Sequence, residues 1–189
     1  MTRVVYLKDE WPRDLFEEAS CAFGVFDGVH RGHRFLIGHA ITEAQLRGGG
    51  SLVLTFSADP DEIVGSKEFF KLMSNRERIA ALTETGVDAV AVIPFDEEFS
   101  RMPPEDFLYW AFGEKAPYSL HVGSDFRFGA RAAGTVETLK QWGIAYGVAV
   151  CGHPLLRDGD SVISATRIRL LLREGKREEA EALAGHLLD

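Results

Sequence analysis

The chain has 189 residues, a length that fits one domain, residues 1–189, better than two, and its 46% hydrophobic and 26% charged residues are ordinary for a soluble globular protein. No apolar run approaches the roughly 20 residues that a membrane helix needs, and no export signal begins the chain, so we expect a cytoplasmic protein without a membrane partner. A formal net charge of −8, without any long run of Lys or Arg, argues against a nucleic-acid partner and leaves the oligomeric state open.

Short apolar runs alternate with helical patterns along the chain. The runs predict six strands, at residues 4–7, 21–26, 51–56, 89–95, 120–122 and 145–150. Most of these runs are continuous, as in strands that are covered on both faces. Helices are predicted at 33–47, 74–85, 103–112, 135–142, 166–173 and 177–187, with loops at 65–71 and 123–134. This order predicts an α/β fold with a mainly parallel sheet, helices on both faces, and a ligand beyond the carboxyl ends of the strands.

The two cysteines, Cys21 and Cys151, lie far apart in the sequence and show no zinc-binding spacing. Because no export signal is present, a disulfide is the less favoured interpretation. We expect two buried apolar thiols.

The strongest chemical signal is the sequence GVFDGVHRGH at residues 24–33, directly after the second predicted strand. A strand that passes through glycines into a helix N-terminus presents backbone N–H groups and a positive dipole end, which suit a phosphate. Gly28 and Gly32 allow the backbone to approach a ligand closely. His30 and His33 can share one face of the first helical turn and donate hydrogen bonds to phosphoryl oxygens. A metal site at these two histidines is less favoured, because no third ligand lies at a suitable spacing. A chance pair of surface histidines would not explain why the pair follows a strand and glycines at the start of a helix.

A second cluster, ISATRIR, lies at residues 163–169. Ser164 or Thr166 can cap the helix that follows. Arg167 and Arg169 lie in its first turns, where the helix dipole favours anions rather than cations. This unfavourable placement is explained if at least one of the two arginines contacts a bound polyphosphate.

Two further segments allow either a structural or a ligand-binding interpretation. Residues 123–129, GSDFRFG, form either a turn with two packed aromatic rings or a wall for a flat ligand, with Asp125 as an acceptor. Residues 55–60, TFSADP, end the third strand, and Phe56 belongs either to the core or to a ligand wall.

These four segments, in this order, resemble the adenylyltransferase module of bacterial FAD synthetases, within the wider HxGH nucleotidyltransferases. The family's hallmarks look like G-x-F-D-G-V-H-x-G-H, T-F-x-P-H-P, G-x-D-F-x-F-G and S-S-T-x-x-R. Residues 71–107 are similar too, and the likeness covers roughly residues 22–185. It implies a Rossmann-like nucleotidyltransferase fold and an enzyme that transfers AMP from ATP to FMN, giving FAD and pyrophosphate.

The resemblance also implies roles for single residues. The catalytic residues would be His30, His33 and Arg167. Other contacts to ATP would come from Gly24, Phe26, Asp27, Gly28, Gly32, Ser164, Thr166 and Arg169. The flavin side would be formed by Phe56, Asp59, Asp125, Phe126 and Phe128. Mg²⁺ would enter with ATP, held mainly by phosphate oxygens and water rather than by a dedicated set of side chains.

Two departures from the family pattern bear on this expectation. Ala58-Asp59-Pro60 replaces Pro-His-Pro, so a carboxylate stands where an anionic acceptor is expected. Ser164-Ala165-Thr166 replaces Ser-Ser-Thr, and the lost hydroxyl donor weakens ATP binding by about 0.5–1.5 kcal/mol.

Two alternative functions follow from these departures. Asp59 fits a nucleotidyltransferase with another phosphorylated acceptor, whereas Ala165 fits a non-catalytic nucleotide or flavin sensor. The family's bacterial members usually carry a riboflavin kinase module after this one. Since the sequence ends at Asp189, riboflavin phosphorylation is not expected here.

Overall fold

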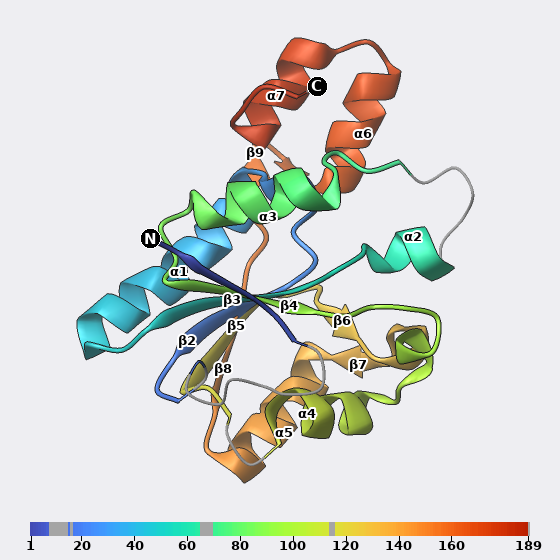
Figure 1. The fold of residues 1–189 in the computed structure, drawn as a ribbon. Helices are drawn as coiled ribbons and strands as arrows, with labels where there is room; N and C mark the ends of the chain where they lie inside the picture. The colour runs from blue at the N-terminus through green and yellow to red at the C-terminus, as the bar shows by residue number, and fades with distance from the viewer. Residues whose placement is uncertain (8–14, 16, 65–69, 114–115, 189) are drawn as a thin grey trace.

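The computed structural model describes residues 1–7, 15, 17–64, 70–113 and 116–188. Its centre is a six-stranded sheet in the order β1-β4-β3-β2-β5-β8, and every neighbouring pair of strands is parallel (Figure 1). These strands are β1 (Arg3–Tyr6), β2 (Ser20–Phe23), β3 (Ser51–Phe56), β4 (Ala89–Ile93), β5 (Ser119–Gly123) and β8 (Ala149–His153). The α/β fold with a mainly parallel sheet is confirmed.

Helices cover both faces of the sheet. On one face lie α1 (Arg31–Arg47) and α3 (Asn75–Thr83), and on the other lie α4 (Pro104–Phe112) and α5 (Val136–Tyr146) (Figure 1). The shorter elements are α2 (Pro60–Val64), the 3₁₀ turns η2 (Asp27–Val29), η3 (Phe99–Arg101) and η4 (Ala130–Ala132), and two small hairpins, β6 (Arg127–Phe128) with β7 (Gly134–Thr135) and β9 (Arg157–Asp158) with β10 (Ser161–Val162). A helical pair, α6 (Ala165–Arg173) and α7 (Arg177–Ala184), closes the chain beyond α3 (Figure 1).

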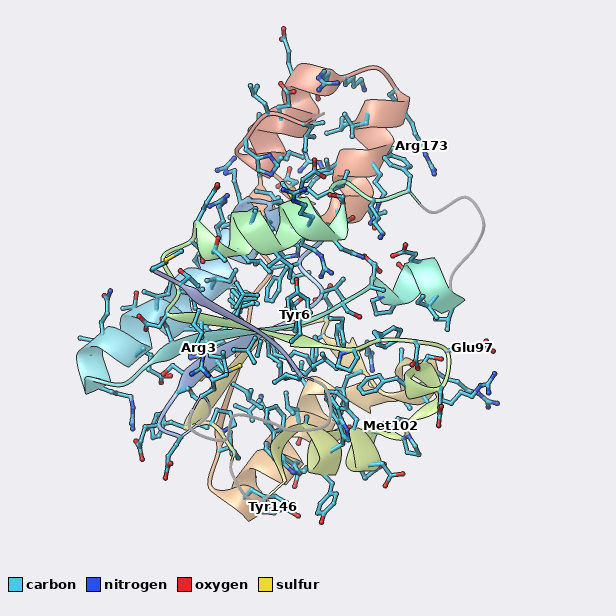
Figure 2. The ribbon with its side chains drawn as sticks, in the orientation of Figure 1. Arg3, Tyr6, Glu97, Met102, Tyr146 and Arg173 are labelled. Atoms are coloured by element: carbon cyan, nitrogen blue, oxygen red, sulfur yellow. The ribbon has the colours of Figure 1, made fainter. Side chains whose placement is uncertain are left out.

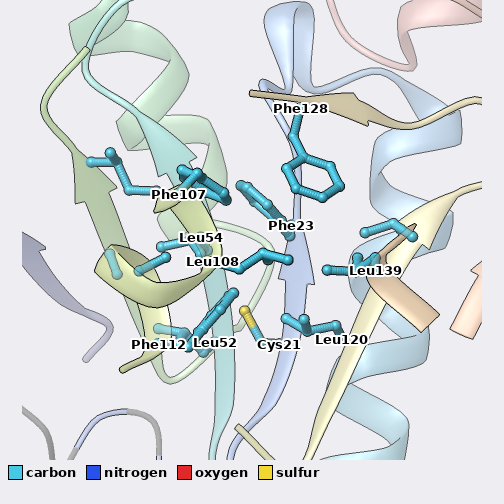
Figure 3. Packing of buried hydrophobic residues seen from close by; sticks show 14 of the residues in the cluster. Cys21, Phe23, Leu52, Leu54, Phe107, Leu108, Phe112, Leu120, Phe128 and Leu139 are labelled. Atoms are coloured by element: carbon cyan, nitrogen blue, oxygen red, sulfur yellow. The ribbon is translucent and has the colours of Figure 1, made fainter. Parts of the chain in front are cut away.

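The central strands are buried on both faces, so alternate residues enter two separate hydrophobic clusters. Cys21 and Phe23 of β2 face α4 and α5, where they pack with Phe107 and Leu139 (Figure 3). Ala22, between them in sequence, faces the cluster under α1 and α3. This arrangement explains why the strands appear in the sequence as continuous apolar runs.

The helical pair α6 and α7 has a small hydrophobic cluster of its own. Its core includes Ile168 and Leu171 of α6 and Leu183 of α7, with Leu72 packed against them. At the end of α6, Arg173 extends beside the chain that leads into α3, and its guanidinium carbon lies 5.4 Å from the centre of the Phe70 ring (Figure 2). Leu72 and Phe70 thus connect the pair to the segment that leads into α3.

Local sequence signals account for most helix ends. Ser74 and Glu77 form the expected capping box at the start of α3. Gly48, with φ 71°, ends α1 in the left-handed conformation that glycine adopts readily. Gly185, with φ 79°, ends α7 at Ala184, three residues before the predicted end at residue 187.

The sixth strand was placed wrongly at residues 145–150. Ala145 and Tyr146 complete α5, and Gly147 ends that helix with φ 72°. The strand begins only at Ala149 and continues to His153. The glycine after the apolar stretch was the signal that separates helix from strand.

Four other predictions need smaller corrections. The second strand ends at Phe23 rather than at residue 26, and the fourth ends at Ile93, before Pro94. Residues 123–134, predicted as a loop, contain β6, η4 and the start of β7, whereas residues 65–69 of the other predicted loop lie outside the described residues. Both cysteines are free thiols, but only Cys21 is buried, and Cys151 is half-buried.

Among the described residues, no helix has the length and apolar character that crossing a membrane requires.

Candidate active site

A cavity of about 670 Å³ opens beyond the carboxyl ends of the central strands. It lies next to β2 and β5, where the strand order turns back, which is the usual ligand position in a doubly wound sheet. Four segments supply most of its wall: residues 24–33, 123–127, 153–156 and 162–169. The structure therefore brings three of the four predicted segments together, and Asp59 joins them from the fourth.

The turn between β2 and α1 is tightly folded. Phe26 and Val29 adopt positive φ angles of 62° and 35°, which is unfavourable for residues with a Cβ. Gly28, with φ 75°, lies between them, and a Cβ at this position would approach Cδ1 of Leu72 to 2.7 Å. Gly28 does not itself line the cavity, so its place in the motif is explained by the backbone conformation and by the contact with Leu72.

His30 caps the helix that begins at Arg31, two residues before the predicted start. Its Nδ1 accepts a hydrogen bond of 3.3 Å from the backbone N–H of His33. Burial, followed by the charges of His186 and Arg169, lowers the pKa of His30 to about 4. The ring is therefore neutral at pH 7, and because Nδ1 accepts, its proton is carried by Nε2. His30 lines the cavity as a hydrogen-bond donor.

His33 stacks on His30 with the ring centres 3.6 Å apart and also lines the cavity. Phe26 packs against the stacked pair: its ring is perpendicular to that of His33, with the two ring centres 5.2 Å apart. Burial, then His30 and then Arg78, holds the pKa of His33 well below its usual value of 6.5. Nδ1 of His33 is buried and has no hydrogen-bond partner among the described residues. A buried polar atom of this kind is costly unless a ligand satisfies it.

Asp27 connects the turn to two distant parts of the chain. Its carboxylate accepts a hydrogen bond from the backbone N–H of Leu72 at 3.1 Å and pairs with Arg169 of α6 at 2.5 Å. Arg169 also donates to the carbonyl of Phe70 at 2.8 Å. Asp27 and Arg169 both line the cavity.

The N-terminus of α6 forms another side of the cavity. The hydroxyl of Ser164 caps the helix by accepting a hydrogen bond of 3.2 Å from the N–H of Arg167, and Ser164 and Thr166 both line the cavity. The Arg167 side chain is placed differently from the expectation: it is directed toward Ser161 and Asp158 of the β9–β10 hairpin, at 3.4–3.5 Å. It is not among the described residues that line the cavity. On a helix, residues 167 and 169 point about 200° apart, so one arginine at most can face the ligand.

The predicted flavin side is divided between cavity and core. Asp59, Asp125 and Phe126 line the cavity. Phe56 packs in the core against Phe23 and Phe95, and Phe128 is buried against Phe107, so the structure brings neither of these rings to the cavity wall. Gly24 and Gly32 line it as expected.

Asp59 is buried, and its Oδ1 accepts a hydrogen bond of 2.9 Å from the N–H of Asp61 at the start of α2. Burial, followed by the charges of Asp27 and Asp61, raises the pKa of Asp59 against the effect of this hydrogen bond. The carboxyl group therefore takes up a proton more readily than an exposed aspartate would.

Sequence reasoning missed Arg78, which is 2% exposed and supports the cavity from beneath. Its guanidinium donates to the carbonyls of Val25 and Phe56 at 2.5 and 2.7 Å and to the hydroxyl of Thr55 at 2.9 Å. It thereby joins the ends of β2 and β3 to α3. In the sequence, Arg78 lies among charged residues and is typical of a solvated helix face.

His153 was missed as well. It ends β8 and lines the cavity, but the sixth strand was predicted to end three residues earlier, so this side chain was not considered as a strand-end residue.

The chain is similar to known proteins over most of its length. The sequence model described as FAD synthetase matches residues 13–167. The bifunctional riboflavin kinase/FMN adenylyltransferase of Escherichia coli (strain K12) is 34% identical over 165 residues, which cover 86% of this chain and 53% of that protein. Its counterpart in Bacillus subtilis (strain 168) is 32% identical over 182 residues, covering 92% and 57%. The chain thus spans about half the length of these curated relatives.

A shorter relative is matched over most of its length. The putative bifunctional riboflavin kinase/FMN adenylyltransferase of Geobacillus thermodenitrificans (strain NG80-2) is 31% identical over 165 residues, which cover 87% of this chain and 88% of that protein.

Two solved structures share the fold. One is described as a macrolide-efflux protein from Streptococcus pneumoniae, with a TM-score of 0.82, 26% identity, and coverage of 100% of this chain and 72% of that one. Pantothenate synthetase from Thermus thermophilus has a TM-score of 0.55 at 18% identity, covering 97% and 81%, and shows the likeness of fold alone. The family match spans far more than half of the chain. The chain belongs to the FAD synthetase family.

Proposed function

We propose that this protein transfers the AMP part of ATP to FMN, giving FAD and pyrophosphate. One observation carries the proposal: the N-termini of α1 and α6 meet at one cavity, together with the rings of His30 and His33. Two positive dipole ends and two imidazoles are suited to a polyphosphate. Membership of the FAD synthetase family and the names of the relatives support ATP and FMN as the substrates.

In this proposal, an oxygen of the FMN phosphate attacks the α-phosphorus of ATP. A new P–O bond forms, the bond from the α-phosphorus to the oxygen bridging to the β-phosphate breaks, and pyrophosphate leaves with that electron pair. A phosphate monoester is mostly dianionic at pH 7, because its second pKa is about 6, so the nucleophile needs no strong general base. Catalysis then depends on bringing two anions together and stabilising the charge between them.

His30 and His33 would supply that stabilisation as neutral donors. The lowered pKa values of both rings keep them uncharged in the free protein. His30 would donate from Nε2, and the buried Nδ1 of His33 would gain a partner from the ligand. A nearby phosphate anion favours the protonated form of an imidazole, so ATP binding would raise both pKa values and strengthen the two hydrogen bonds.

Arg169 would exchange partners when ATP binds. Its pair with Asp27 lies on the cavity wall, where a phosphate would compete for the guanidinium. The Asp27 carboxylate would then be available to a cation. We propose that Mg²⁺ enters with ATP, and the carboxylates of Asp27 and Asp59 offer the oxygen ligands that it prefers beside phosphate oxygens. When bound, Mg²⁺ supplies neutralising charge to the phosphates.

A second candidate function keeps the same chemistry with a different phosphorylated acceptor. The observation that favours it is Asp59, a buried carboxyl on the cavity wall where the family pattern has an imidazole. An ionised Asp59 would repel an acceptor phosphate that an imidazole would attract, and burial raises the pKa of this carboxyl and so opposes its ionisation.

The test is incubation of the protein with ATP, Mg²⁺ and FMN, with FAD and pyrophosphate both measured. The expected result is equal amounts of the two products. Parallel reactions with other phosphorylated acceptors test the second candidate, which is supported if pyrophosphate appears only with one of those. Tight ATP binding without pyrophosphate from any acceptor would contradict both proposals and favour a sensor.

A further inference from the structure

A line of three polar side chains connects the middle of α1 with the cavity wall. Nε2 of His121, on β5, lies 2.9 Å from Oε2 of Glu43 on α1. Nδ1 of the same ring lies 2.9 Å from Nε2 of His153, at the end of β8. His121 is buried, with 3% exposure, and His153 lines the cavity. We call Glu43, His121 and His153 the histidine relay.

Neighbouring groups define the state of Glu43. Its Oε2 accepts hydrogen bonds from the hydroxyls of Ser20, at 2.8 Å, and Ser119. Burial opposes ionisation, but the hydrogen bonds from Ser119, His121 and Ser20 outweigh it and lower the pKa of Glu43. Glu43 is therefore a carboxylate, which can only accept hydrogen bonds.

The carboxylate determines where the protons of the relay lie. Because the Glu43 carboxylate only accepts, a His121 ring that carries one proton holds it on Nε2, and its Nδ1 is then an acceptor. His153 must then donate from Nε2 to Nδ1 of His121. Burial, then His39 and His121, lowers the pKa of His153 to about 4, so its ring is neutral. The remaining nitrogen, Nδ1 of His153, thus carries a lone pair and no proton.

We propose that the histidine relay makes His153 a hydrogen-bond acceptor that selects a nucleotide whose base carries an exocyclic amino group. The inference rests on the proposed function, since it assumes that a nucleoside triphosphate occupies the cavity. A 6-aminopurine offers an N–H to this nitrogen, whereas a 6-oxopurine presents an oxygen there and leaves both acceptors without a donor.

The position of His153 favours the base over the phosphates as its partner. The segment from His153 to Leu156 runs along the cavity wall from the end of β8 to the hairpin before α6. The phosphates of the same nucleotide would lie at the N-termini of α1 and α6, beside the backbone N–H groups of these helix starts, which donate to an anion. Pro154 and Leu155 add apolar surface next to His153, as a flat ring requires.

The test compares the affinities for ATP and for ITP, which differ at this position by an amino group and an oxygen, by calorimetry with Mg²⁺ and without FMN. The wild-type protein should bind ATP about tenfold more tightly than ITP. His153→Phe keeps a flat ring without an acceptor and should bring the ratio close to one. His39→Phe is the matched control: the His39 ring stacks on His153 at 4.3 Å but lies outside the cavity wall, so the ratio should stay at its wild-type value.

His121 is a positioning residue, and its role has a readout of its own. In protein labelled with ¹⁵N-histidine, long-range ¹H–¹⁵N spectra at pH 7.5 should show His121 and His153 both protonated at Nε2 only. In His121→Phe, His153 should no longer be protonated at Nε2 only. The affinity ratio of ATP to ITP should fall in the same variant. A proton on Nδ1 of wild-type His153, or equal affinity of the wild-type protein for ATP and ITP, would overturn the inference.

These outcomes are distinct from a failure of the proposed function. A tenfold preference for ATP that depends on His153, in a protein that makes no FAD, would support the relay and contradict the adenylyltransferase. FAD synthesis by a protein with equal affinity for ATP and ITP would support the adenylyltransferase and overturn the relay. An unchanged ratio in His153→Phe with a raised KM for FMN would assign the residue to the acceptor and overturn the inference.

Discussion

The two helix N-termini that meet at the cavity are built differently. That of α1 is fixed: His30 caps it, Phe26 and Val29 hold positive φ angles before it, and the helix packs on the central sheet. That of α6 has an ordinary serine cap and belongs to a helical pair with a separate hydrophobic cluster. From this difference we expect the start of α1 to keep its position when a ligand binds and the start of α6 to adjust.

Polar contacts join the two regions. Arg169 of α6 pairs with Asp27, and His186, after α7, donates from Nε2 to the carbonyl of Gly28 at 2.8 Å. The charged hydrogen bond between Arg169 and Asp27 can be exchanged for one between Arg169 and a phosphate. Changes at the α1 end should therefore impair chemistry or stability, and changes at the α6 end should impair ATP affinity.

The largest effect is expected at His33. His33→Ala should lower the rate of pyrophosphate release about 100-fold, because it removes a preorganised donor from the developing phosphate charge. His39→Ala, the same change at an exposed position of the same helix, should leave the rate within twofold, as a rough bound for a residue outside the cavity. Stopped assays of pyrophosphate release provide the measurement, and thermal unfolding checks that each variant is folded. A near-normal rate from folded His33→Ala would refute the role of His33 as a donor to the phosphates.

The pH dependence of stability should reveal the buried cap of α1. The pKa of His30 is about 4 in the folded chain and 6.5 ordinarily, so the unfolded chain binds more protons between these values. The stability that this shift provides is complete above pH 6.5 and is lost as the pH falls toward 4. We expect a loss of about 2 kcal/mol in the free energy of unfolding over this range.

His30→Asn isolates this contribution, because asparagine caps helices well and does not titrate near these pH values. Urea unfolding of both proteins at pH 6.5, 5.5 and 4.5 gives the comparison, with pH values chosen around the pKa shift. The variant should show a shallower loss than the wild-type protein. Parallel curves would mean that His30 titrates normally in the fold.

At the α6 end, two arginines provide a matched pair. Arg169→Gln should raise the KM for ATP about tenfold, since a charged hydrogen bond to phosphate is lost. Arg167→Gln should change it by less than about twofold, because Arg167 is directed toward the β9–β10 hairpin. Initial-rate kinetics give the KM for ATP of both variants. A larger effect at Arg167 would restore the catalytic role that the family resemblance implies and would require its side chain to turn toward the cavity.

The smallest effects concern backbone conformation at the start of α1. Gly28→Ala should lower the free energy of unfolding by about 1 kcal/mol, given the positive φ and the close approach to Leu72. Gly38→Ala, in the middle of α1 with open space around it, should raise it by up to about 1 kcal/mol. Equal effects of the two substitutions in urea unfolding would show that the turn is not strained.

Much of the fold follows from local patterns in the sequence. Ser51–Phe56 was predicted with its observed bounds, because three glycines precede this largely apolar run and Ser57 follows it. The strand at 145–150 failed because its first residues are also apolar helix residues, and only Gly147 separates the two elements. Short hairpins such as β6–β7 carry too few residues to show a period.

The candidate site was predictable where a motif fixes the backbone. His30, His33 and Ser164 reach the cavity because strand ends and helix starts place them there. Phe56 could not be assigned, since a strand-end aromatic ring turns toward the core or the ligand according to the packing around it. His121 and Glu43 lie 78 positions apart, so their contact follows from the packing of α1 on β5 and not from any local pattern.

The central claim is that a triphosphate binds where the N-termini of α1 and α6 meet. A crystal structure with Mg²⁺ and a non-hydrolysable ATP analogue tests it most directly. We expect phosphate oxygens within roughly 2.7–3.2 Å of Nε2 of His30 and of donors at the start of α6, with Arg169 turned from Asp27 toward the phosphates. A triphosphate bound elsewhere, with Arg169 still paired to Asp27 and Nδ1 of His33 still without a partner, would contradict the account.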